Sequence, residues 1–266
     1  MHIHYLDPYA PRHSPIHSLD ARVKLLLTLA LILTTALTPV GVWPVYILLT
    51  ALITVIVILS DLGVGFVLKR ALLALPFMLA ALPVIFTLEG DTAIHFDLGP
   101  WNLTVYYDGV ERFISIALKS WISVQAGIVL ATSTPFPELL SAMRAIRVPR
   151  LLVAIFALMW RYLFVLADEA IRLMRARSAR MGHSDQPGLK PGGSLVWRAH
   201  VTGGMAGNLF LRAFERSDRI YVAMLSRGFD GEVRTTPMPP MSSGSWLTLV
   251  SLLLLLAGLL LFAYLF

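Results

Sequence analysis

Two arginines near the ends of helical stretches are the residues of this chain best suited to binding chemistry. The stretches Ala179-Arg180-Met181-Gly182 and Ser226-Arg227-Gly228 each place one arginine within two positions before a glycine. Glycine favours the left-handed turn that ends a helix, and arginine in the last turn complements the helix dipole. A guanidinium also carries five donors in a rigid fork that can dock into a partner. The pattern therefore predicts two helix ends. A more specific interpretation is that each arginine docks into a groove of a partner protein.

Signatures of catalysis and nucleotide binding are missing from the sequence. The stretch PGLKPGGS contains Gly and Lys but lacks the spacing of a phosphate-binding loop, and neither HExxH nor GxSxG occurs. Cysteine is absent, which excludes disulfides, a thiol nucleophile and Cys-ligated zinc. We expect no catalytic residue, no ATP site, no resident metal and no cofactor.

Four histidines, and one lysine within an apolar run, each have more than one possible role. His2, His4, His13 and His17 fall in a proline-broken N-terminal tail, where we interpret them as solvated, although His2 with the terminal amine could bind a transition metal. Lys119 lies within an apolar run, where it could snorkel outward, pair with a neighbouring helix or contact another subunit.

The composition is that of a membrane protein. Hydrophobic residues make up 57% of the 266-residue chain and charged residues only 14%, against about 25% charged in soluble domains. Uncharged runs of spanning length predict five transmembrane helices, over 23–39, 43–60, 71–88, 111–132 and 246–266.

The charge distribution predicts the orientation of these spans. The loop from Glu89 to Glu111 holds five acidic residues and no Lys or Arg, whereas 15 of the 22 basic residues lie between Pro135 and Arg234. By the positive-inside rule the first loop is outside and the second segment cytosolic. Topology thus accounts for the net charge of +6, and we expect no nucleic-acid partner.

The long inner segment is the unusual part of the predicted organisation. After a cytosolic tail (1–21) and four spans (22–133), residues 134–234 form a cytosolic domain, and a last span covers 245–266. The periodicity of this domain predicts a short helix over 138–146 and two long helices, 150–181 and 198–227, joined by a Gly/Pro-rich connector over 183–197.

The apolar residues of the two long helices predict where these helices pack. In the second helix, one apolar stripe is formed by Phe210, Phe214, Tyr221 and Met224. We interpret 151–167 as a helix along the membrane face or against another subunit, a sixth span being the alternative.

Three stretches carry a resemblance to a known family: HSLDARVKLLL, RAIRVPRLLVAIFALMWRYLFVLADEA and AMLSRGFDG. From about residue 14 onward the chain resembles the T component of energy-coupling factor transporters, in the cobalt-type branch called CbiQ. The resemblance implies two cytosolic ATP-binding cassette ATPases and a separate substrate-binding membrane subunit as partners. The T component inserts two coupling helices into grooves on the ATPases.

Carried over to this chain, the resemblance implies that Arg180 and Arg227 each contact one ATPase. Ala179 and Met181 would flank the first, and Ser226 and Gly228 the second. The chain departs from the family pattern at Met181, where the family has Gly, and at Ser226, where it has Ala. Arg177 is therefore a possible substitute for Arg180.

The sequence thus predicts an all-α polytopic protein of the inner (plasma) membrane, with about five transmembrane helices and a cytosolic domain of two long coupling helices. Its expected function is non-catalytic energy coupling in ATP-driven cobalt uptake. The alternatives are a T component for nickel or a vitamin and, from other classes, a stand-alone secondary transporter or an intramembrane enzyme.

Overall fold

The computed structural model describes residues 8–87, 92–98, 101–180, 194–231 and 239–265 and divides the chain into two compact units. One unit, here called the bundle unit, comprises Pro8–Ile146 and Met238–Phe266. The other, here called the helix-pair unit, comprises Arg147–Pro237 together with Met1–Asp7. Residues 134–146, which the sequence suggests belong with the long helices, fall in the bundle unit.

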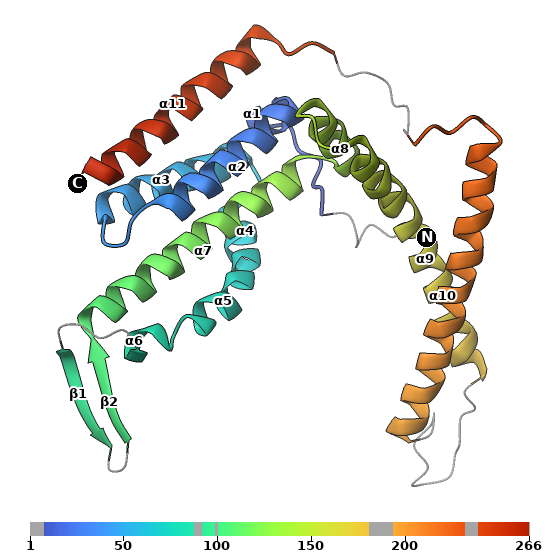
Figure 1. The fold of residues 1–266 in the computed structure, drawn as a ribbon, viewed down its shortest axis with the longest axis horizontal. Helices are drawn as coiled ribbons and strands as arrows, with labels where there is room; N and C mark the ends of the chain where they lie inside the picture. Colours follow the sequence, from blue (N-terminus) through green and yellow to red (C-terminus); the bar gives the residue numbers. More distant parts are fainter. Residues whose placement is uncertain (1–7, 88–91, 99–100, 181–193, 232–238, 266) are drawn as a thin grey trace. The chain divides into compact units, whose positions relative to one another are not determined.

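Four long helices build the bundle unit: α2 (Ala21–Leu37), α3 (Trp43–Leu59), α7 (Tyr107–Ser133) and α11 (Ser243–Leu265) (Figure 1). Along α3, Val45, Leu49 and Ile53 recur every four residues, which places them on one helix face. All three are at most 1% exposed and pack with Ile122 of α7 and Leu256 of α11. The core of this unit is therefore a helix-on-helix interface, as its apolar runs predict.

The turn between α2 and α3 forms where the sequence predicts it. Gly41 has φ +89°, a left-handed conformation that favours glycine. Pro44 then lies in the first turn of α3, where its missing N–H removes no helical hydrogen bond. The predicted pair of apolar helices is thereby confirmed, each being 17 residues long.

The third apolar run is broken into short segments, as its prolines predict. It comprises α4 (Val64–Ala71), a 3₁₀ turn (Leu72–Ala74), α5 (Leu75–Ala80) and α6 (Val84–Thr87). Pro76 lies in the first turn of α5, and Pro83 directly precedes α6. Helical structure in this run begins at Val64, seven residues before the predicted span.

A β-hairpin lies between α6 and α7, within the loop that the charge pattern assigns to the exterior. Strand β1 (Thr92–Leu98) pairs antiparallel with β2 (Trp101–Tyr106). The sequence analysis does not predict it, although TAIHFDL and WNLTVY both alternate apolar and polar residues. The all-α prediction is otherwise confirmed for the described chain.

Short helices and the N-terminal segment cover the end of α7. Helix α1 (Pro15–Ser18) precedes α2, and α8 (Phe136–Ala145) follows α7 and packs on α2. The buried Lys24 donates from Nζ to the carbonyl of Ser133 at 3.0 Å, and the backbone N–H of Ala10 donates to the carbonyl of Thr132 at 3.0 Å. The last carbonyls of a helix have no donor within the helix, and these two bonds supply donors to two such carbonyls at the end of α7.

The helix-pair unit consists of α9 (Arg150–Arg180) and α10 (Leu195–Leu225), each 31 residues long. The Oγ of Ser194 caps α10 by accepting from the N–H of Trp197 at 3.2 Å. The two predicted long helices are confirmed, with α10 starting three residues earlier than predicted. Most of the predicted connector lies outside the described residues.

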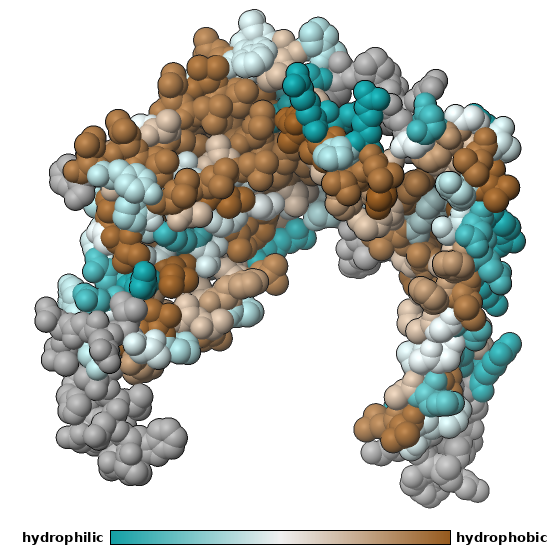
Figure 2. Space-filling view, viewed as in Figure 1, coloured by the Kyte–Doolittle hydropathy of each residue, from teal (hydrophilic) through white to brown (hydrophobic). Residues whose placement is uncertain are grey.

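Within the described ranges, four helical stretches are long and apolar enough to cross a membrane: Val64–Thr87, Tyr107–Ser133, Arg150–Arg180 and Ser243–Leu265. Trp43–Leu59 is a shorter apolar helix. Figure 2 shows hydrophobic side chains over much of the visible surface of the bundle unit. The chain is therefore a polytopic membrane protein, and the first half of α9 meets the same criterion of length and composition as the spans.

Candidate functional site

Helices α9 and α10 run antiparallel and share a groove at one end of the pair and a hydrogen bond at the other. Leu151, near the start of α9, shares a groove with Met224, near the end of α10. At the far end, Arg177 Nη1 donates to Thr202 Oγ1 at 2.7 Å. Residue numbers thus rise along one helix as they fall along the other, and Figure 1 shows the two helices crossing.

A buried carboxylate joins the two helices midway. Glu169 of α9 is only 9% exposed, and its Oε2 accepts from Arg216 Nη2 at 3.0 Å. Its Oε1 accepts from Arg212 Nη1 at 3.4 Å. A carboxylate bound by two guanidinium groups forms charge-assisted hydrogen bonds, which are stronger than neutral ones. The sequence analysis missed this link, because Glu169 is embedded in the basic half of α9 and spacing alone does not show which residues meet across two helices.

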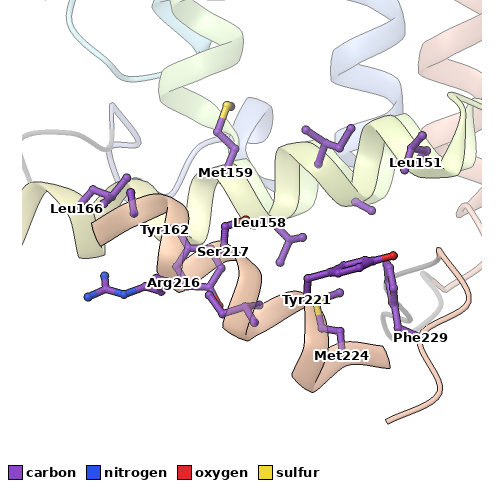
Figure 3. Close-up of a pocket in the computed structure, with 14 residues that line it drawn as sticks. Leu151, Leu158, Met159, Tyr162, Leu166, Arg216, Ser217, Tyr221, Met224 and Phe229 are labelled. Atoms are coloured by element: carbon purple, nitrogen blue, oxygen red, sulfur yellow. The ribbon is translucent and has the colours of Figure 1, made fainter. Parts of the chain in front are cut away.

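An apolar groove of about 340 Å³ lies between the helices at the end where α10 finishes. Its walls include Leu158 and Tyr162 of α9 and Ile220 and Tyr221 of α10. In Figure 3, Tyr221 and Phe229 lie beside each other in this groove, and Arg216 extends away from them. The apolar groove thus lies toward one end of the pair and the ionic link near its middle.

The predicted helix stop at Arg227 and Gly228 is confirmed. Gly228 has φ +75°. Its N–H donates to the carbonyl of Leu225 at 3.0 Å, and the N–H of Phe229 donates to the carbonyl of Met224 at 3.0 Å. This hydrogen-bond pair is the Schellman arrangement, in which an apolar residue after the glycine packs back on the last turn. Phe229 and Met224 line the same groove. Arg227 therefore sits exposed on a helix end whose backbone is fixed.

Arg180 is the last residue of α9, and both it and Ala179 are exposed. Met181 lies outside the described residues. Arg177, the possible substitute for Arg180, instead reaches across to Thr202 of α10. Arg177 is thus engaged in the pairing of the helices, whereas Arg180 projects beyond it.

The antiparallel pairing places the two arginines at opposite ends of the helix pair. A helix of 31 residues is about 45 Å long at ~1.5 Å per residue. Because the end of α10 lies beside the start of α9, this length approximates the separation of Arg180 from Arg227.

Two other candidates, His17 and Lys119, make hydrogen bonds within the bundle unit. His17 Nε2 lies 3.1 Å from the carbonyl oxygen of Ala10, and its Nδ1 lies 2.7 Å from Ser14 Oγ. Lys119 Nζ donates to the carbonyl of Ala36 in α2 at 3.0 Å, so it pairs with a neighbouring helix. Within the described ranges, no group of three or more His, Asp or Glu residues could hold a metal ion. His2 and His4 lie outside these ranges.

Apolar helices of spanning length, combined with a pair of 31-residue helices, define a class of multi-pass membrane protein. A family model described as "Cobalt transport protein", CbiQ, matches residues 12–238. The chain belongs to this family, the cobalt-type branch of the transmembrane components of energy-coupling factor transporters.

Individual relatives support this assignment. The chain is 30% identical over 185 residues to the cobalt transport protein CbiQ of Rhodobacter capsulatus, covering 68% of this chain and 72% of the relative. It is 27% identical over 244 residues to the energy-coupling factor transporter transmembrane protein EcfT of Ruminiclostridium cellulolyticum, covering 88% and 86%. A third relative, from Methanocaldococcus jannaschii, is 30% identical over 134 residues, but the match spans only 47% of its length.

Proposed function

We propose that this chain is the coupling subunit of an ATP-driven importer for cobalt ions, and that α9 and α10 are its coupling helices. The observation that carries the proposal is the placement of two exposed arginines, Arg180 and Arg227, at opposite ends of one antiparallel helix pair. Each arginine would contact one cytosolic ATPase, flanked by Ala179 and Met181 at one end and by Ser226 and Gly228 at the other.

A coupling element must be stiff enough to transmit a displacement of its ends. The Glu169 link to Arg212 and Arg216 and the Arg177 bond to Thr202 tie the helices together at two levels. Movement of one tip would therefore rotate the pair as a body, which is the rigid-body mode of conformational change. The bundle unit would pass this movement to a separate substrate-binding membrane subunit.

Support for cobalt as the cargo comes from the family and from the relative in Rhodobacter capsulatus, both described as cobalt transport proteins. The related transmembrane proteins called EcfT carry no ion in their name, so nickel or a vitamin is the alternative cargo. A transporter component needs no active site of its own, in keeping with the absence of catalytic motifs from the sequence. As a multi-pass protein served by cytosolic ATPases, it would reside in the plasma membrane.

Substitution of the two tip arginines tests the proposal. The variants are Arg180→Ala, Arg227→Ala and the double variant, in full-length protein expressed with its ATPase and substrate-binding subunits. A charge-assisted hydrogen bond contributes about 1.5–3 kcal/mol, so loss of one tip contact should weaken ATPase association roughly ten- to hundredfold. The measurements are co-purification of the ATPase and uptake of radioactive cobalt.

Arg219→Ala supplies the matched control, because Arg219 is an exposed arginine of α10 away from its tip. We expect this variant to assemble and transport like the wild type. A double Arg180/Arg227 variant with undiminished assembly and transport would refute the assignment of the tips.

A further inference from the structure

A second groove, in the bundle unit, combines apolar walls with two cations. It has a volume of about 640 Å³ and lies between α7 and the segment that joins α4 to α5. Val124, Ile128 and Ala131 line it from one face of α7. Lys69 and Arg70 line it at the end of α4.

The floor of this groove is unfilled by the described protein. Val124, Ile128 and Ala131 are each only partly buried. Gly127, between them on the same face, has no side chain, and a methyl group added there would meet nothing within 4 Å. A volume of 640 Å³ falls within the ~300–1,000 Å³ typical of ligand sites. Because α7 is long and apolar enough to span the membrane, lipid chains are the natural contents of such a channel.

The cations mark one end of the groove as a site for negative charge. Lys69 and Arg70 are both exposed, and the Arg70 guanidinium lies 4.3 Å from the centre of the Phe66 ring, which supports its position. Among the described residues that line the groove there is no carboxylate to neutralise them. Basic pockets between membrane helices on the cytoplasmic side bind anionic headgroups.

The depth of the groove fits a lipid rather than a free anion. Val124 and Ala131 are seven residues apart on α7, which corresponds to about 10 Å along the helix. Ala131 lies in the last turn of α7, at the end that the charge pattern assigns to the cytosol. If a headgroup lies beside Lys69 and Arg70, the part of the acyl chain nearest to it therefore lies along Ile128 and Val124.

We propose that this groove binds one anionic phospholipid of the cytosolic leaflet. The phosphate contacts Lys69 and Arg70, and an acyl chain occupies the channel over Gly127. This site is independent of the arginine tips of the helix pair.

Native mass spectrometry of the purified full-length chain in detergent tests the site, with phosphatidylglycerol and phosphatidylcholine as the two probes. We expect phosphatidylglycerol to bind more tightly. The double variant Lys69→Gln/Arg70→Gln should weaken this binding about 30-fold, since each cation near a membrane surface contributes about 1 kcal/mol to the attraction of anionic lipid. The control Arg172→Gln/Arg219→Gln removes the same charge from exposed positions of the helix-pair unit and should leave binding unchanged.

Gly127→Leu tests the channel separately, because it fills the floor while keeping both cations. It should also reduce phosphatidylglycerol binding, and it keeps the proposal testable if the charge variant fails to fold. Soluble glycerol phosphate should not compete, whereas competition would show that the groove is a simple anion site. Equal affinity for the two lipids, or full binding by either groove variant, would overturn the proposal.

Discussion

The Glu169 link predicts how strongly one carboxylate holds α9 to α10. In Glu169→Gln the side chain keeps its size but loses its charge, and its amide nitrogen cannot accept a hydrogen bond from a guanidinium. Arg216 is one-third exposed and Arg212 60% exposed, at 3.0 and 3.4 Å from the carboxylate oxygens. A hydrogen bond to a charged group contributes about 1.5–3 kcal/mol, and an exposed ion pair about 0.2–1 kcal/mol.

Because the amide oxygen of the glutamine retains one hydrogen bond, the free energy that holds α9 to α10 should fall by about 2 kcal/mol. This loss corresponds to roughly a 30-fold rise in the equilibrium constant for local opening of the helix pair. Amide hydrogen exchange of the full-length chain in lipid nanodiscs measures that equilibrium along α9 and α10. We expect exchange to accelerate in the middle of both helices and to remain unchanged in α3.

Asp168→Asn is the matched control, because Asp168 is the exposed neighbour of Glu169 and loses the same charge. It should leave exchange as in the wild type. If the two variants exchanged at the same rate, the buried carboxylate would not be what couples the helices.

Two further predictions concern the α10 end and the N-terminal segment. Gly228→Ala places a side chain at φ +75°, a cost of about 1–2 kcal/mol; we expect it to lower cobalt uptake by shifting Arg227, whereas Gly204→Ala, in an open helical position, should leave uptake intact. Burial lowers the pKa of His17 below 6.5, against the opposing effect of the Ala10 hydrogen bond. Because the folded state favours the neutral ring, its contribution to stability is present above pH 6.5 and is lost as the pH falls through the lowered pKa. Limited proteolysis of residues 8–18 should accelerate on acidification, and the non-titrating variant His17→Gln should abolish that pH dependence.

The sequence predicts the helix ends well because their causes are local. Gly228 favours the left-handed turn that ends α10. Pro76 and Pro83 interrupt the third apolar run whichever helices pack against it. These signals need no knowledge of the neighbouring helices.

Packing faces are less predictable, because they depend on which helices meet. The sequence places Phe210, Phe214, Tyr221 and Met224 in one stripe, yet Phe210 is 68% and Phe214 60% exposed. Tyr221 and Met224 of this stripe line the groove with α9, and the other groove residues of α10 include Ala213, Arg216 and Ile220. The small Ala213 permits close approach of the helices, and the partner of Arg216, Glu169, lies 47 residues away in sequence.

The measurement that tests the central claim most directly is cross-linking from the two helix tips. The chain has no cysteine, so a single cysteine introduced by Arg180→Cys or Arg227→Cys provides a unique attachment site. With a thiol-reactive photocross-linker in the assembled complex, we predict an adduct with an ATPase from each tip, and with two different ATPase copies when both tips carry the probe. If both tips failed to reach an ATPase while an Arg219→Cys probe on the α10 surface succeeded, the coupling role of Arg180 and Arg227 would be contradicted.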